Sequence, residues 1–404
     1  MKNEFLPVMR FAVCSDAHIQ GFDSSGYRRL KKAVDLSFAF AEKNEFNNKL
    51  DAFLIAGDIT DKGIKEEFDA FKLIYDYATE KGTEVLCVVA KGHDSISMGK
   101  KSLSYYNSLT NQPTDFHVCI GRYHFIGLST CKLPEIYYTP MQKKWLINEL
   151  DKAVKDTPDK PVFLMHHEHV KYTVYGSGDI DGWGHDFFTP ILKKYPNVVD
   201  FSGHSHYPLN DPRSLWQNEY TAIGTGSLKY TELTVDGERK IHPDNRNDCG
   251  NFWIAEIDKD SNLRLVGIDC EAKKVLCEYY LRNPANKKNR EYTEEKQRER
   301  SKPPVFPENA EILIRKEYGS CFLEYPKAES TDGMPVFIYR VSVYDKNGKE
   351  VANGKTLPSY YLYKTEDRLC ANLGALPKGE YTLRIKAETV YGVQSESISK
   401  IIEI

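Results

Sequence analysis

The chain up to about residue 235 alternates short apolar runs with longer amphipathic segments. Apolar residues recur at helical spacing over 27–46 and 65–81, and Thr139-Pro140 has the form of a helix start, with the threonine as N-cap. Between these segments lie five apolar runs with the length and composition of buried strands, at 11–13, 52–55, 85–89, 162–165 and 198–201. This alternation predicts α/β layers.

Beyond the fifth run the chain is richer in strand patterns, at 220–228, 252–257, 263–269 and 274–280. A dense stretch of mixed charge follows over 287–300 and is closed by Pro303-Pro304. Mixed signs with few large apolar residues are more typical of a solvated linker or a short exposed helix than of a binding patch. We therefore expect a first domain over residues 1–285 and a charged linker over 286–306.

From residue 307 to 404 apolar and polar residues alternate with the period of two that marks half-buried strands. Tyr339, Val341 and Val343 lie on one face of such a strand, and the same alternation returns over 381–388. Turn sequences stand between the strands, at 345–348 and 376–379. The pattern predicts a small all-β, immunoglobulin-like sandwich, similar to fibronectin type III domains. That likeness is one of fold and indicates no function by itself.

Composition excludes some classes of partner. The chain has 404 residues, 41% of them apolar and 28% charged, which suits two globular domains. Its formal net charge of -3 argues against binding of a nucleic acid polymer. No apolar stretch approaches the ~18 residues of a membrane span, and the start of the chain has no signal-peptide pattern. With nine cysteines, an odd number, we expect reduced thiols, a cytoplasmic location and no membrane partner.

Each of the five buried runs is followed by residues that commonly bind metals. The segments are Asp16-Ala17-His18, Gly57-Asp58-Ile59-Thr60-Asp61, Lys91-Gly92-His93-Asp94, His166-His167 and Gly203-His204-Ser205-His206. Taken singly, each is weak, because a lone Asp or His in a loop is usually an ordinary polar residue. Five in succession, all placed where a strand gives way to a loop, indicate a site for two metal ions.

The order and wording of these segments resemble the calcineurin-like metallophosphoesterase superfamily, whose pattern is D-x-H, G-D-x-x-[DN], G-N-H-[DE], a lone His and G-H-x-H. The resemblance spans about residues 8 to 235. It implies two facing sheets flanked by helices, with the strands after residue 219 completing the second sheet. It also implies two divalent metal ions, and Mn, Fe and Zn all suit such ligands.

The resemblance assigns the metal ligands residue by residue. The first metal takes Asp16, His18, Asp58 and His206, and the second takes Asp58, His166 and His204. His166 is preferred to His167 because the ligand of the family directly follows the strand. The family's asparagine, a further ligand of the second metal, is Gly92 here, so we expect the second metal to bind more weakly.

Catalytic roles also follow from the resemblance. The metal pair would activate a water molecule for attack on phosphorus. His93 would stand beside the leaving oxygen, with Asp94 holding its ring, and Asp61 would support the ligands from behind. The expected activity is hydrolysis of a small phosphodiester or phosphomonoester. The alternative is a weakly active or inactive binding protein that has kept the fold, and Gly92 motivates it.

Three residues between and after the last two motifs are candidates for substrate binding. Trp183 and Tyr175 can stack on a base or sugar, or equally pack onto their own loop. Arg213 can meet a substrate phosphate, or equally pair with Asp211. For the C-terminal domain we expect contacts with protein or carbohydrate.

Overall fold

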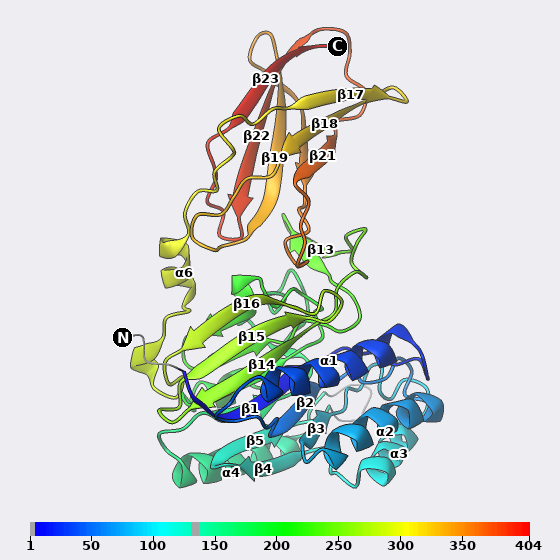
Figure 1. Cartoon of the computed structure of the whole chain (residues 1–404), viewed down its shortest axis with the longest axis vertical. Helices are drawn as coiled ribbons and strands as arrows, with labels where there is room; N and C mark the ends of the chain where they lie inside the picture. The colour runs from blue at the N-terminus through cyan, green and yellow to red at the C-terminus, as the bar shows by residue number, and fades with distance from the viewer. Residues whose placement is uncertain (1–4, 131–136) are drawn as a thin grey trace. The chain divides into compact units, whose positions relative to one another are not determined.

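The computed structural model describes residues 5–130 and 137–404, and the chain divides into two compact units, Met1–Thr293 and Glu294–Ile404 (Figure 1). Each unit is described by itself. Within the described ranges, no helix combines the length and apolar character that crossing a bilayer requires.

The first unit is built on two six-stranded sheets. The first sheet has the order β16-β15-β14-β1-β2-β3, and the second has the order β10-β11-β9-β6-β5-β4. The strands of the first sheet are β1 (Pro7–Cys14), β2 (Ala52–Ala56), β3 (Glu84–Val88), β14 (Asn251–Asp258), β15 (Leu263–Asp269) and β16 (Lys274–Leu281). Those of the second are β4 (Phe116–Ile120), β5 (Tyr123–Gly127), β6 (Val162–Met165), β9 (Val198–Ser202), β10 (Leu215–Gln217) and β11 (Thr221–Gly224).

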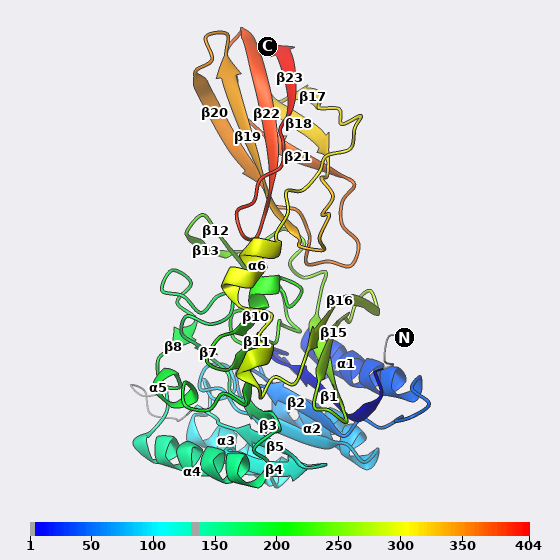
Figure 2. The same cartoon turned by 90° about the vertical axis from the view of Figure 1, so that its left-hand side faces the viewer.

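Helices cover the outer face of each sheet (Figures 1 and 2). Helices α1 (Ser25–Glu42), α2 (Lys65–Glu80) and α3 (Lys100–Thr110) lie against the first sheet, and α4 (Pro140–Asp156) and α5 (Thr189–Leu192) against the second. The predicted helices at 27–46 and 65–81 are confirmed, as is the start at Pro140, where Thr139 and Gln142 form a capping box. Helix α3 escaped prediction because polar residues dominate its sequence.

Two layers of apolar side chains explain why the strands are apolar throughout. In β1, Phe11 and Val13 lie between the sheets, whereas Ala12 and Cys14 lie under the helices. The Phe11 ring, for example, meets Phe163 of the second sheet with ring centroids 4.9 Å apart. A strand buried on both faces needs apolar residues at every position, so it shows a continuous run rather than alternation.

The middle of each sheet is parallel, and this places the candidate motifs. Strands β1, β2 and β3 run parallel, as do β5, β6, β9 and β11. Parallel strands bring their carboxyl ends to one edge of a sheet, where α/β proteins bind ligands. The loops after β1, β2, β3, β6 and β9 carry the five motifs of the sequence.

The strands predicted after residue 250 exist, but they extend the first sheet. β14 pairs antiparallel with β1, and β15 and β16 follow it outward. Only β11 joins the second sheet, so the expectation that all of these strands complete the second sheet is wrong. An apolar run shows that a strand is buried but does not say which edge it joins.

Shorter elements complete the first unit. They are β7 (His169–Val170), β8 (Gly184–His185), the hairpin of β12 (Leu233–Val235) and β13 (Glu238–Ile241), and two 3₁₀ turns, η1 (Pro212–Ser214) and η2 (Lys287–Asn289). Within the expected linker, Arg290 is buried and donates hydrogen bonds to the Thr221 hydroxyl and to the carbonyls of Pro284 and Pro196. The stretch up to residue 293 is therefore anchored to the first unit rather than solvated.

The second unit begins with the short helix α6 (Glu294–Arg300) and continues as two sheets, of order β17-β18-β21 and β20-β19-β22-β23. Their strands are β17 (Leu313–Glu317), β18 (Ser320–Pro326), β19 (Val336–Asp345), β20 (Glu350–Thr356), β21 (Arg368–Asn372), β22 (Glu380–Thr389) and β23 (Ile398–Glu403). Side chains of both sheets form one core, in which Tyr339, Val341 and Val343 are buried as their alternation predicts. The likeness to fibronectin type III domains stays a prediction.

Candidate metal centre

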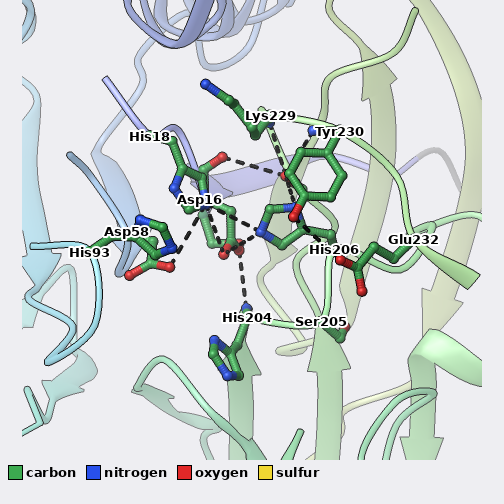
Figure 3. Close-up of polar contacts among 12 residues, drawn as sticks. Asp16, His18, Asp58, His93, His204, Ser205, His206, Lys229, Tyr230 and Glu232 are labelled. Atoms are coloured by element: carbon green, nitrogen blue, oxygen red, sulfur yellow. Dashed lines mark hydrogen bonds and ion pairs between the residues drawn. The ribbon is translucent and has the colours of Figure 1, made fainter. Parts of the chain in front are cut away.

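The loops at the carboxyl ends of four strands bring six ligand-type side chains together. Asp16 and His18 follow β1, Asp58 follows β2, His167 follows β6, and His204 and His206 follow β9. They form two groups, in each of which one potential ligand atom per residue lies within 4.8 Å of the others. The first group is Asp16, His18 and His206, all labelled in Figure 3, and the second group is Asp58, His167 and His204.

The backbone is strained at five of these six residues. Asp16, His18, Asp58, His204 and His206 have φ values of 54°, 47°, 49°, 72° and 58°, in the left-handed region that side-chain-bearing residues rarely adopt. Such conformations cost of order 1–3 kcal/mol each and persist where the surroundings impose them, often at functional sites. Gly57 also has a positive φ, which glycine adopts readily. In addition, a Cβ there would overlap the ring of His167, so both observations favour glycine.

The structure places His167, and not His166, beside Asp58 and His204. His166 is fully buried on the helix side of the sheet, with Nε2 2.7 Å from Asp200 Oδ1 and its ring stacked on Phe188. His167 Nε2 lies 3.3 Å from Asp58 Oδ2 and 3.0 Å from His204 Nδ1.

The sequence-based preference for His166 is wrong because side chains alternate between the two faces of the strand. Phe163 and Met165 face the inner core between the sheets, and Leu164 faces the helices. Successive side chains of a strand point to opposite faces, so His166 continues the helix side and His167 the inner side. Asp58 lies on the inner side. Once the inner face of β6 is known, the alternation of side chains along the strand therefore places His167 beside Asp58.

Both carboxylates of the centre are held in the charged form. Burial raises the pKa of Asp16, but the neighbouring His206, His167 and His18 outweigh it and lower the pKa well below its usual range. For Asp58, burial is likewise outweighed, mainly by His167 and His18, and its pKa also falls. Burial lowers the pKa of His18 to about 3, so its ring is neutral at ordinary pH. At His167 and His206 burial is outweighed by Asp58 and Asp16 respectively, and the pKa of each ring rises. Anionic carboxylates among imidazoles are the donor set that divalent metals take.

Two buried carboxylate oxygens that form no hydrogen bond indicate whether a metal ion would fit the two groups. Asp16 Oδ2 accepts hydrogen bonds from the Ser15 hydroxyl and from His204 N (3.1 Å), whereas Asp16 Oδ1 is buried and forms no hydrogen bond among the described residues, its ion-pair neighbour being His206 Nε2 at 3.1 Å. Asp58 Oδ1 is likewise buried and forms no hydrogen bond among the described residues. A buried carboxylate oxygen without a hydrogen bond is costly, and a cation would satisfy both atoms. The residues present therefore fit divalent metal ions, one at each group.

The far nitrogens of several rings are held in place, which fixes the nitrogens that face the centre. His167 Nδ1 donates to the Ala56 carbonyl (2.8 Å), which leaves Nε2 directed at the second group. His206 Nδ1 lies 3.3 Å from the Ser227 hydroxyl, and His18 Nδ1 lies 3.7 Å from Asp61 Oδ1. Partners of this kind orient metal-binding imidazoles and raise their basicity. Asp61 thus supports His18 from behind, as the sequence suggested.

His169 is a further supporting residue, which sequence reasoning missed. It is buried, and its two ring nitrogens lie 2.8 Å from the Ser202 hydroxyl and 2.7 Å from the Ser205 hydroxyl. Ser205 stands between His204 and His206, so His169 braces the loop that carries both ligands. Nothing in its sequence context distinguishes it from an ordinary loop histidine.

His93 lies beside the first group. Its ring meets the ring of His18 edge-on with centroids 4.3 Å apart, and its side chain is 45% exposed. His93 Nδ1 is 2.7 Å from the Asp61 carbonyl, which only accepts, so Nδ1 carries a hydrogen and Nε2 is the nitrogen left for a substrate.

Asp94 does not hold the ring of His93, contrary to the expectation from sequence. Asp94 Oδ1 accepts from the backbone N–H and the hydroxyl of Thr60, both at 2.8 Å, and Oδ2 accepts from Ala90 N at 2.9 Å. Burial and the nearby Asp58 raise the pKa of Asp94 to about 7. Its role is to tie the loop after β2 to the loop after β3, because it is fully buried and turned to backbone donors.

Gly92 stands directly at the second group. A Cβ at this position would lie 4.0 Å from Asp58 Oδ1 and meet no other side chain closely, and the backbone of Gly92 is not in the left-handed region. An asparagine here would therefore fit and carry its amide toward Asp58. The glycine removes one neutral oxygen donor from this group and leaves its three other residues in place.

Of the three substrate-binding candidates, the structure brings Trp183 to the centre. Its ring meets His204 edge-on at 4.8 Å, and the ammonium of Lys240 lies 4.5 Å from its centroid. The Tyr175 hydroxyl is engaged with the backbone of Thr234, donating to its carbonyl and accepting from its N–H.

Arg213 forms two hydrogen bonds to Asp211, at 2.9 and 2.7 Å, and its guanidinium lies 3.8 Å from the Tyr175 ring. For Tyr175 and Arg213 these contacts favour the packing roles that the sequence left open.

The loop after β11 lies beside the first group. No sequence motif predicted this position. Tyr230 packs its ring 4.3 Å from the ring of His206, and its hydroxyl lies 3.3 Å from Glu232 Oε1, which His242 also contacts at 2.9 Å. Figure 3 shows Tyr230 beside His206, with Lys229 next to it in the chain. The residues carry no metal-ligand pattern, so only the fold reveals them.

Comparisons with known proteins agree with this geometry. Residues 9–208 match the family described as calcineurin-like phosphoesterases. The chain is 29% identical over 205 residues to a probable glycerophosphodiester phosphodiesterase from Arcobacter nitrofigilis, an alignment that covers 48% of this chain and 70% of that protein. It is 25% identical over 204 residues to a cAMP/cGMP dual specificity phosphodiesterase from Mycobacterium tuberculosis, covering 48% and 61% of the two chains.

Among solved structures, a purple acid phosphatase from yellow lupin (Lupinus luteus) seeds aligns with 67% of this chain and 53% of its own, at 12% identity and a TM-score of 0.45.

Proposed function

Because residues 9–208 match the calcineurin-like phosphoesterase family, we propose that this protein hydrolyses small phosphoesters, phosphodiesters foremost, with the help of two divalent metal ions. The relatives at 29% and 25% identity are named as phosphodiesterases, which supports the preference for diesters. The observation that carries the proposal is the pair of ligand groups, each with a buried carboxylate oxygen that forms no hydrogen bond among the described residues.

Seven side chains have roles in this proposal. Asp16, His18 and His206 would hold the first metal, and Asp58, His167 and His204 would hold the second. The family pattern adds Asp58 to the ligands of the first. Metal ions in such a site lower the pKa of water and neutralise phosphoryl oxygens. His93 serves as the general acid, since its Nδ1–H is held by the Asp61 carbonyl and its Nε2 can deliver a proton to the leaving oxygen.

The aromatic face of Trp183 beside His204 offers a surface for the base or sugar of a nucleotide, or for another flat ester arm. This role and the preference for diesters depend on each other, because a diester has a second arm to bind. The second unit, proposed as a fibronectin type III-like module, would contact protein or carbohydrate.

One observation favours a second candidate function. Gly92 leaves the second group one donor short, and a metal-poor relative would bind ligands rather than hydrolyse them. The presence of His93 and of a complete first group speaks for the enzyme, because a decayed site would have lost several of these residues.

The deciding experiment compares the natural protein with Gly92→Asn. Hydrolysis of bis(p-nitrophenyl) phosphate and p-nitrophenyl phosphate is measured with added Mn²⁺, and bound metal is counted by mass spectrometry in the same samples. We expect turnover by the natural protein, and a second-site metal affinity about 10-fold higher in Gly92→Asn. Activity in Gly92→Asn alone would instead support the binding protein, and inactivity of both would refute the hydrolase.

A further inference from the structure

One lysine lies on the loop beside the first ligand group and outside the region that matches the family. Lys229 lies on the loop after β11, and the match ends at residue 208. Its backbone is fixed on both sides: its N–H donates to the Ser227 hydroxyl (2.9 Å), and its carbonyl accepts from Arg29 Nη1 (2.5 Å). Ser227 in turn faces the ring of His206. The base of the side chain is therefore set by the same loop that supports the first group.

The ammonium of Lys229 lacks a counter-ion. Within residues 5–130 and 137–404, no carboxylate lies within ion-pair distance of Lys229 Nζ and no acceptor forms a hydrogen bond with it. Among the described residues of the same unit, by contrast, six other lysines form close ion pairs, namely Lys31, Lys32, Lys72, Lys152, Lys171 and Lys259. The side chain is also partly buried, and this burial lowers the pKa of Lys229 from its ordinary value.

The charged groups that face Lys229 are already engaged elsewhere. They are Asp61, Arg29 and Glu67. Asp61 Oδ2 accepts from Gln20 (3.1 Å), Glu67 accepts from the N–H of Lys62 (2.8 Å), and Arg29 pairs with Glu271 (2.7 Å). A partly desolvated cation without a partner costs free energy, and an incoming anion would recover that cost.

We propose that Lys229 binds an anionic oxygen of the phosphoester substrate, on the side of the centre where His93 and Asp61 lie. The inference rests on the proposed function and extends it to a residue that determines substrate binding. Asp61 links the two positions, because its carbonyl holds the His93 ring and its charge acts on Lys229. The anionic oxygen belongs either to the phosphate that is cleaved or to an acidic group on an ester arm.

Two substrates distinguish these sources. They are diesters of p-nitrophenyl phosphate whose second arm is either 4-carboxyphenyl or 4-carbamoylphenyl, so that only one carries an additional negative charge. Lys229→Met should lower kcat/KM by roughly 10- to 100-fold, the loss expected when a hydrogen bond to a charged group is removed. An equal loss with both esters places the contact at the cleaved phosphate, and a loss confined to the carboxylate ester places it on the arm.

Controls separate this role from a structural one. Lys229→Arg keeps the charge and should recover most of the activity, because the contacts that fix the loop come from the backbone of Lys229. Lys274→Met removes an exposed lysine of β16 and should match the natural protein. Lys229→Met that equals Lys274→Met with both esters overturns the proposal.

A binding measurement keeps the two proposals distinguishable. Calorimetry with 4-carboxyphenylphosphonate, which cannot be hydrolysed and carries both kinds of anion, is done on Mn²⁺-loaded protein. Weaker binding to Lys229→Met than to Lys229→Arg supports the role of Lys229 even if the natural protein shows no turnover, which would refute only the hydrolase. Equal binding to the natural protein, Lys229→Met and Lys229→Arg, or no binding to any of them, overturns the role of Lys229.

Discussion

The two ligand groups of the centre differ in how completely they are supported. In the first group His18 and His206 each have a partner behind the ring, Asp61 and Ser227, and Asp16 Oδ2 is held by Ser15 and His204 N. The second group has His167 firmly anchored to the Ala56 carbonyl, but it faces Gly92 where an oxygen donor would complete it.

This difference implies a division of labour. A group whose ligands are all oriented retains its metal at low metal concentration. A group that lacks one donor binds its metal only at higher metal concentration. Activity would then follow the occupancy of the second group. The variants below test the comparison, from the largest expected effect to the smallest.

The largest effect is expected for His93→Ala. The ring lies against His18 and clusters with His18 and Asp61, but it belongs to neither ligand group, so both metals should remain while turnover falls about 10²- to 10⁴-fold. Steady-state kinetics and metal counts on the same sample give the two quantities. A general acid matters most for a poor leaving group, so the loss should be greater for diphenyl phosphate than for bis(p-nitrophenyl) phosphate. Equal losses would contradict proton donation by His93.

The next effect separates His167 from its neighbour. His167→Ala should empty the second group and lower activity by at least about 100-fold, while the first metal remains, because a lost ligand exceeds the loss of an outer partner. Metal counts by mass spectrometry check this directly.

The matched control is His166→Ala. It leaves Asp200 buried without its partner and should lower the free energy of unfolding by about 3 kcal/mol while both metals stay bound. Retention of two metals in His167→Ala, or loss of one in His166→Ala, would reverse the assignment.

The same pair of histidines shows where sequence reasoning stops. The five motifs, the α/β layers and the period-two strands of the second unit were all visible as patterns, because they follow from burial and strand geometry. The choice between His166 and His167 depends on which face of β6 is the inner one, and that is set by packing against the first sheet. The role predicted for Asp94 could not be judged from sequence for a similar reason, since the groups that donate hydrogen bonds to it, on Thr60 and Ala90, come from separate loops. Lys229 and His169 have no pattern at all, because only tertiary contacts distinguish them.

The smallest effect is expected for the support of the first group. Ser227→Ala removes the hydroxyl 3.3 Å from His206 Nδ1 and should weaken first-site metal binding by about 10-fold, at the low end for an outer partner, because Tyr230 still packs on the ring. Titration with Mn²⁺ under chelator competition measures the change.

Thr231→Val is the control on the same loop, since the hydroxyl of Thr231 faces Cys249 and no ligand. If Ser227→Ala binds the first metal as tightly as Thr231→Val, then the packing of Tyr230 alone orients His206, and the first group owes its advantage over the second to its donors and not to their supports.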